Sequence, residues 1–106
     1  MGTYEQDSTW QEIQRFLPSE NRLAGDNMPI EYSIPVCGAQ IHIDHYRSDT
    51  PRGRVLLFHG VGGNGRLLSF IALPLVANGF EVVCPDFPLY GCTEYEETVE
   101  IGRAHV

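Results

Sequence analysis

The spacing of hydrophobic residues changes along this chain, and each spacing predicts a different element. Residues 30–36 alternate apolar and polar side chains, which is the two-residue period of a half-buried strand. Residues 40–46 alternate again, and Gly38-Ala39 separates the two runs. We expect an antiparallel hairpin with its turn at Gly38-Ala39. Pro35 cannot donate a hydrogen bond to a neighbouring strand, so the first strand is expected at a sheet edge.

The following segment has a different pattern. Residues 55–58 are continuously apolar, as in a strand buried on both faces, and a glycine-rich loop follows over residues 59–65. Residues 66–77 are helix-like and apolar almost all round, which predicts a largely buried helix, and Pro74 predicts a kink or a late helix start. A second apolar strand over residues 80–84 completes a βαβ unit of parallel sheet. We expect this last strand to have no partner on its far side.

Before the hairpin, the spacing is helical. Apolar residues recur three and four positions apart at Trp10, Ile13, Phe16 and Leu17. Ser8 or Thr9 is the expected N-cap, and Pro18 ends the pattern. We therefore divide the chain into an N-terminal helix and loop (residues 1–29), the hairpin with the βαβ unit (residues 30–100) and a tail (residues 101–106).

Composition and charge exclude several kinds of partner. The 106 residues are 42% hydrophobic and 20% charged, which is typical of one small folded domain. The net charge of −7 argues against nucleic acid and anionic membranes, because both are polyanionic. The sequence has no apolar run long enough for an integral membrane segment and starts without a secretory signal pattern, so the expected location is cytoplasmic.

Histidine and cysteine spacing predicts neither a metal site nor a cofactor. The three cysteines lack CxxC spacing and are interpreted as reduced thiols. His42, His45 and His105 have no partners at metal-ligand spacing, so we expect them on the surface or as packing residues.

The glycine-rich loop has two interpretations. Gly60, Gly62 and Gly65 spell GxGxxG between a strand and a helix, and Asp86 follows about 20 residues later, as in a dinucleotide-binding module. Three features oppose this: the preceding hairpin, His59 at the start of the loop, and Pro85 just before the acid.

The second interpretation rests on two motifs. His59-Gly60-Val61-Gly62-Gly63 follows one apolar strand, and Pro85-Asp86-Phe87-Pro88-Leu89-Tyr90-Gly91 follows the next. They resemble the His-Gly loop and the Asp-x-Pro-Gly-x-Gly segment of α/β hydrolases, although Leu89-Tyr90 replaces the usual glycine. The order of elements is also similar over roughly residues 30–93. This resemblance implies the N-terminal part of an α/β-hydrolase fold, incomplete here, from a serine hydrolase. Within the family, the sequence resembles the lineage of lysophospholipases, monoacylglycerol lipases and serine aminopeptidases.

The resemblance also implies an oxyanion hole. The backbone N–H of Val61 would stabilise negative charge on a substrate carbonyl oxygen, supported by His59 and by Gly60, Gly62 and Gly63. His59 is expected to orient the loop through a ring hydrogen bond, because the catalytic histidine of the family comes late in the chain. Asp86 is expected to cap a turn and not to act as an acid.

The catalytic triad is absent from this sequence. No Gly-x-Ser-x-Gly occurs, and Ser69 lies in the apolar helix. The serine, the acid and the base are expected downstream, so we predict a fragment that is inactive by itself and whose parent takes a small acyl ester. A non-catalytic hydrolase-like protein that has lost the nucleophile is a further alternative.

The last residues match a possible translation of a non-native DNA segment. Glu100-Ile101-Gly102-Arg103-Ala104-His105-Val106 is what GAG ATC GGA AGA GCA CAC GTC encodes, which resembles the start of a short-read sequencing adapter. We therefore interpret residues 101–106 as translated adapter and exclude them from the expected fold.

Overall fold

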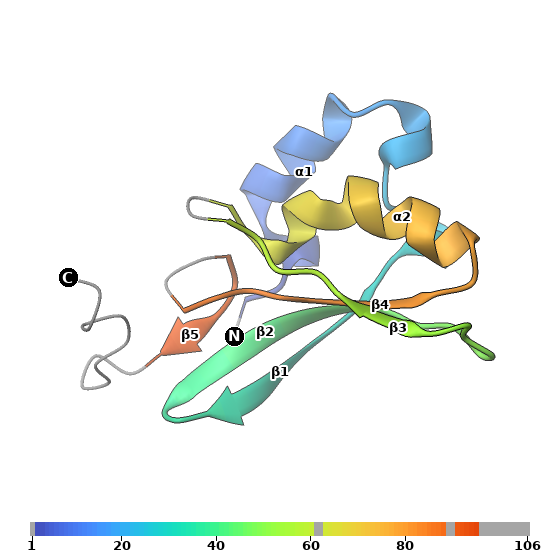
Figure 1. Cartoon of the computed structure of the whole chain (residues 1–106). Coiled ribbons are helices and arrows are strands. Elements are labelled where there is room, and N and C mark those ends of the chain that lie inside the picture. Colours follow the sequence, from blue (N-terminus) through green and yellow to red (C-terminus); the bar gives the residue numbers. More distant parts are fainter. Residues whose placement is uncertain (1, 61–62, 89–90, 96–106) are drawn as a thin grey trace.

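A computed structural model describes residues 2–60, 63–88 and 91–95 (Figure 1). In chain order, with η marking 3₁₀ turns, the elements are η1 (Tyr4–Gln6), α1 (Ser8–Arg15), η2 (Ser19–Asn21), η3 (Gly25–Asn27), β1 (Ile30–Val36), β2 (Ala39–Tyr46), β3 (Arg54–Leu56), η4 (Gly65–Leu68), α2 (Ser69–Ala77), β4 (Glu81–Pro85) and β5 (Glu94–Tyr95). Within these residues no helix is long and apolar enough to cross a bilayer.

The strands form one mixed sheet in the order β1-β2-β4-β3. β1 and β2 pair antiparallel, as do β2 and β4, whereas β3 and β4 are parallel and α2 connects them. β5 pairs with the start of β2. The predicted hairpin and βαβ unit are confirmed, and β1 lies at the edge that Pro35 predicted. The prediction of an unpaired far side on the last long strand was wrong: β4 lies between β2 and β3, because the crossover returns the chain to the hairpin side of β3.

The hairpin turn lies one residue earlier than predicted. Val36 pairs with Ala39, so the turn consists of Cys37 and Gly38, and Ala39 already belongs to β2. Both turn residues have positive φ, 48° and 85°. Two-residue hairpin loops favour this conformation because its twist matches that of the strands.

The N-cap of α1 differs from the sequence prediction, whereas the late start of α2 agrees with it. The side chain of Asp7, and not that of Ser8 or Thr9, caps α1, because its carboxylate accepts a hydrogen bond from the Thr9 N–H at 2.9 Å. α2 begins only at Ser69, after the η4 turn, which agrees with the late start that Pro74 predicted.

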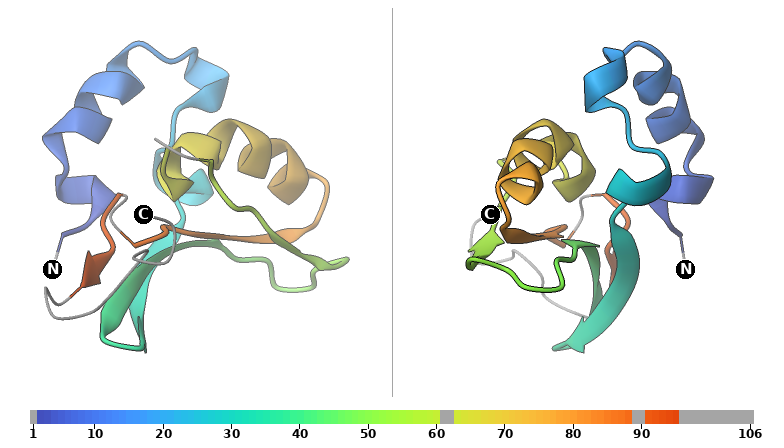
Figure 2. Two further views of the ribbon diagram at one scale, coloured as in Figure 1. Left: turned by 60° about the vertical axis from the view of Figure 1, so that its left-hand side comes forward. Right: turned by 90° about the vertical axis from the view of Figure 1, so that its right-hand side faces the viewer.

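α1 and α2 lie on the same side of the sheet (Figures 1 and 2). The core between the helices and the sheet consists of Tyr4, Trp10, Leu23, Tyr46, Ala72, Val82 and Cys84. α2 was predicted to be largely buried, but Phe70 on its outer side is 57% exposed. Among the described residues, only the sheet-facing side of α2 is covered.

The opposite face of the sheet carries several exposed apolar side chains in the described part of the chain. Alternate residues of β1 point outward and are exposed: Ile30, Tyr32, Ile34 and Val36. In β3, Val55 faces the helices and is partly buried, whereas Leu56 is 56% exposed. The prediction that β3 is buried on both faces was therefore wrong, because the two helices cover one face only.

Candidate functional site

The predicted oxyanion loop begins at His59, which is almost completely buried. The backbone N–H of Phe87 donates to His59 Nε2 at 2.9 Å, and His59 Nδ1 lies 2.9 Å from the carbonyl oxygen of Gly60. Because Nε2 accepts, the ring proton is on Nδ1 and donates to Gly60. Both ring nitrogens are therefore engaged in contacts with the backbone, and they leave no lone pair for a general base.

Aromatic contacts reinforce the link between His59 and Phe87. The two rings lie 4.7 Å apart between centroids in a tilted arrangement, and Phe58 stacks on Phe87 at 5.7 Å. Phe58, His59 and Phe87 thus form one contact cluster that joins the start of the loop to the segment after β4.

The other described end of the loop is held by Asp86. The Gly63 N–H donates to the Gly60 carbonyl at 3.1 Å and thus connects the two described parts of the loop. The side chain of Asn64 then accepts from the Leu67 N–H at 3.0 Å and caps η4. Between them, the Gly65 N–H donates to Asp86 Oδ1 at 2.6 Å. The turn-capping role predicted for Asp86 is present, because Oδ2 accepts from the Cys92 N–H. The carboxylate also holds the glycine-rich loop after β3 through Oδ1.

Asp86 belongs to a buried cluster of charged side chains. His42 lies between two carboxylates, with Nε2 2.8 Å from Glu31 Oε1 and Nδ1 3.2 Å from Asp86 Oδ2. Burial opposes protonation of the imidazole, but the adjacent Asp86 and Glu31 carboxylates outweigh it and raise the pKa of His42 to about 9. Burial also opposes ionisation of Asp86, yet its hydrogen bonds with His42 and Tyr4 lower its pKa. His42 is therefore an imidazolium beside ionised carboxylates at neutral pH.

The prediction that His42 is a surface or packing residue was wrong, whereas His45 is partly exposed. Only 1% of His42 is exposed, and it is fixed in the ionic cluster. His45 bonds to the Tyr32 hydroxyl at 2.8 Å and to the carboxylate of Glu81. Residue spacing could not reveal either site, because the partners come from strands and turns distant in the sequence.

Three members of this cluster offer ligand atoms that a metal ion could use. Those of Glu31, His42 and Asp44 all lie within 4.8 Å of one another. Both carboxylate oxygens of Asp44, however, accept hydrogen bonds from Arg66. The guanidinium already neutralises this carboxylate, and a protonated His42 has no lone pair for a metal. The cluster is better suited to ion pairing than to metal binding.

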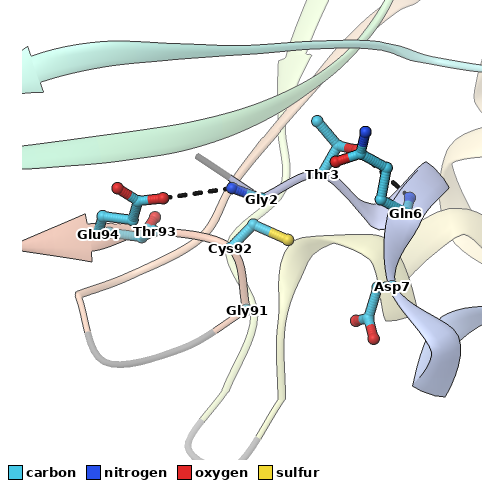
Figure 3. A pocket seen from close by; sticks show the side chains of 8 residues that line it. All are labelled: Gly2, Thr3, Gln6, Asp7, Gly91, Cys92, Thr93 and Glu94. Atoms are coloured by element: carbon cyan, nitrogen blue, oxygen red, sulfur yellow. Dashed lines mark hydrogen bonds between the residues drawn. The ribbon is translucent and has the colours of Figure 1, made fainter.

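A pocket of about 450 Å³ lies between the N-terminal segment and the segment that leads into β5 (Figure 3). It is lined by Gly2, Thr3, Gln6 and Asp7 from the N-terminal segment and by residues 91–94 from the segment that leads into β5. Cys92 is the potential nucleophile on this wall, but burial and the nearby Asp86 carboxylate raise the pKa of its thiol to about 12. Since the thiolate is the nucleophilic form, Cys92 is not activated for catalysis.

The geometry does not favour the dinucleotide interpretation. Asp86, the acid that would bind a ribose hydroxyl, is completely buried and already accepts from Gly65, Tyr4 and Cys92. The Gly65 N–H, which would face a phosphate, is taken by the same carboxylate.

Several predicted residues lie outside the described part of the chain. These are the proposed donor Val61, its neighbour Gly62, and Leu89-Tyr90, where the second motif departs from the family. Residues 96–106, which include His105 and the interpreted adapter tail, are also outside it.

No protein-family model matches the sequence, and no curated protein matches it significantly. The structure, in contrast, is similar to solved hydrolases. A thioesterase domain from the curacin biosynthetic pathway is 33% identical, with a TM-score of 0.61, and the match covers 67% of this chain and 25% of that one. A haloalkane dehalogenase, DatA from Agrobacterium tumefaciens C58 solved as a mutant, is 25% identical with a TM-score of 0.56, over 76% and 25% of the two chains.

A putative epoxide hydrolase from Klebsiella pneumoniae subsp. pneumoniae MGH 78578 shares the fold at 19% identity and a TM-score of 0.54, over 64% of this chain and 22% of that one. The chain thus spans about a quarter of the length of the structures that it matches. The strand order, the His-Gly loop after β3 and these similarities define a partial α/β-hydrolase fold. The chain belongs to the α/β-hydrolase superfamily.

Proposed function

We propose that this chain supplies the oxyanion loop and part of the substrate-site wall of a serine hydrolase that cleaves small acyl esters or thioesters. The donor is the backbone N–H of Val61. Thioesters are included because a structural neighbour with 33% identity is a thioesterase domain. The observation that carries the proposal is the fixing of the His-Gly loop to the end of β4, through the Phe87–His59 and Gly65–Asp86 hydrogen bonds.

The chemistry requires a rigid loop. In acyl transfer, negative charge develops on the carbonyl oxygen, and preorganised N–H groups stabilise it without further rearrangement. Loss of one such donor costs roughly 2.7–4 kcal/mol of transition-state stabilisation. His59 serves this function as a structural residue, because both ring nitrogens hold the loop.

The nucleophile has to come from another segment. The printed sequence contains no Gly-x-Ser-x-Gly, Ser69 is buried at the start of α2, and the pKa of the Cys92 thiol is about 12. We therefore expect the 106-residue chain to hydrolyse no ester by itself.

Extending the reading frame tests the proposal. The source DNA is read beyond the codon for Glu100, and the extended protein is assayed with p-nitrophenyl acyl esters and acyl thioesters, with the 106-residue chain as the inactive control. A downstream Gly-x-Ser-x-Gly followed by an acid and a histidine, together with activity, supports the proposal. An extended frame without a nucleophile means a non-catalytic relative. Genomic codons that continue through residues 101–106 would contradict the adapter interpretation.

A backbone substitution tests the donor itself. In the extended enzyme, Val61→Pro removes the N–H and should lower kcat by about 10²–10³. Val61→Ala keeps the N–H and serves as the matched control, with kcat expected within a few-fold of the parent. Equal activities of the two variants would exclude Val61 as the donor.

A further inference from the structure

We infer that Asp86 is a positioning residue for the proposed oxyanion loop and that, together with Phe87, it clamps both described ends of this loop onto the end of β4. The inference rests on the proposed function for its catalytic meaning. The clamp itself is a matter of geometry and can be tested without activity.

Two consecutive residues make the two attachments. Phe87 holds the first residue of the loop through its N–H to His59 Nε2 at 2.9 Å. Asp86 holds the last residue through Oδ1, which accepts from the Gly65 N–H at 2.6 Å. Because both attachments start from adjacent positions after β4, any shift of this segment moves both ends of the loop together.

The carboxylate of Asp86 is itself held in one orientation. Its Oδ2 accepts from the Tyr4 hydroxyl at 2.7 Å and from the Cys92 N–H at 2.9 Å. Its backbone N–H donates to the His42 carbonyl at 2.9 Å, and its carbonyl accepts from the Thr93 hydroxyl at 2.6 Å. A rotation that releases Gly65 would also break the bonds to Oδ2 inside a fully buried site, where unpaired polar groups are costly.

Glycine on each side makes room for this carboxylate. A Cβ at Gly65 would lie 2.9 Å from Asp86 Oδ1, and a Cβ at Gly91 would lie 2.2 Å from Asp86 Oδ2. Gly91 also has φ of +55°, a conformation that other residues adopt rarely. The two loops thus lack side chains at the two positions that contact the clamp.

The clamp needs a carboxylate and not merely a polar side chain. Oδ1 and Oδ2 both act as acceptors, whereas an amide offers one oxygen and one NH₂ group. In Asp86→Asn, the NH₂ group faces either the Gly65 N–H or the donors at Oδ2. The attachment of Gly65 therefore becomes weaker even if the fold persists.

The test is nuclear magnetic resonance on the isotope-labelled 106-residue chain. In Asp86→Asn, we expect the Gly65 amide to exchange with solvent at least 10-fold faster relative to the β4 amide of Val82, and the His59 ring nitrogen shifts to change. Glu81→Gln is the control, because Glu81 is also a buried carboxylate but pairs with His45 and Arg54 and not with the loop or its neighbours. It should lower global stability and leave the Gly65-to-Val82 exchange ratio unchanged.

Two outcomes overturn the inference. One is that, in Asp86→Asn, the exchange rates of the Gly65 and Val82 amides change by the same factor while the His59 ring nitrogen shifts stay unchanged. The other outcome is measured on the unsubstituted 106-residue chain and applies even if Asp86→Asn does not fold. It is the absence of a through-hydrogen-bond coupling between the Gly65 amide nitrogen and the Asp86 carboxyl carbon. Neither outcome depends on hydrolysis, so an inactive extended protein would overturn the proposed function and leave the clamp intact.

Discussion

Arg66 and Asp44 form a bidentate ion pair in which neither side chain is exposed to solvent. Arg66 Nε lies 2.6 Å from Asp44 Oδ2, and Arg66 Nη2 lies 3.0 Å from Asp44 Oδ1. The guanidinium also lies over the rings of Tyr4 and Trp10, with its central carbon 4.7 and 5.3 Å from the ring centroids. This pair connects the residue directly after the oxyanion loop to the sheet and to the N-terminal segment.

Loss of one partner of this pair should destabilise the chain strongly. Arg66→Met leaves Asp44 as an uncompensated buried carboxylate, which is expected to lower the free energy of unfolding by about 3–5 kcal/mol. Arg15→Met is the control, because the Arg15–Glu12 pair is exposed, at 73% and 60% of the two side chains, and should contribute less than about 1 kcal/mol. Urea unfolding of both variants measures the difference. Similar values would show that the buried pair is not important for stability.

Stability should decrease at alkaline pH because of His42. Its pKa is raised in the folded state, from an ordinary value of 6.5 to about 9, so the folded state binds the proton more tightly than the unfolded state. This stabilisation is complete below about pH 6.5 and is lost as the pH rises through about 9. Urea unfolding at a series of pH values should show the decrease. In His42→Gln the same range should be nearly flat, and an equally steep decrease there would assign the effect to another group.

Two glycines of the same loop should differ in their tolerance of alanine. A Cβ at Gly65 would approach Asp86 Oδ1 and the Cys84 carbonyl oxygen to 2.9 Å, whereas one at Gly60 would meet nothing within 4 Å. We expect Gly65→Ala to destabilise the fold by about 1–3 kcal/mol, since the Cys84 backbone cannot move aside easily. Gly60→Ala should be close to neutral. Thermal unfolding of the pair checks this, and equal melting temperatures would contradict the close packing at Gly65.

The two faces of the sheet should respond differently to truncation. Val82 is completely buried beneath the helices, and Val82→Ala should cost roughly 1.5–3 kcal/mol. Ile34 is a larger side chain, but it is 43% exposed on the face opposite the helices, so Ile34→Ala should cost less than about 1 kcal/mol. Denaturant unfolding measures both variants. A larger cost for Ile34 would mean that the outer face is covered in solution.

Much of the local structure could be predicted from the sequence. The alternation in residues 30–36 and 40–46 predicted the hairpin, and Pro35 predicted its position at the edge. The strand–loop–helix–strand order predicted the parallel unit. These features depend on local periodicity and on backbone restrictions, which short segments of sequence contain. The predicted hairpin turn and α1 cap were displaced by one or two residues. Several neighbouring residues could form the turn or cap the helix, so local sequence did not single one out.

The sequence by itself determined which segments are strands and helices and which loop carries the family's His-Gly motif. Only the tertiary structure decided which face of each strand is covered. In β1 the polar Glu31 points toward the helices and the apolar Ile34 points outward, the reverse of what hydrophobicity suggests. The reason is that the crossover between β3 and β4 places Arg66 over the inner face of the sheet. Glu31 and Asp44 can pair with Arg66 only if their side chains point toward that face. Alternation fixes the period of a strand, whereas the partners that arrive from distant segments fix the side that is buried.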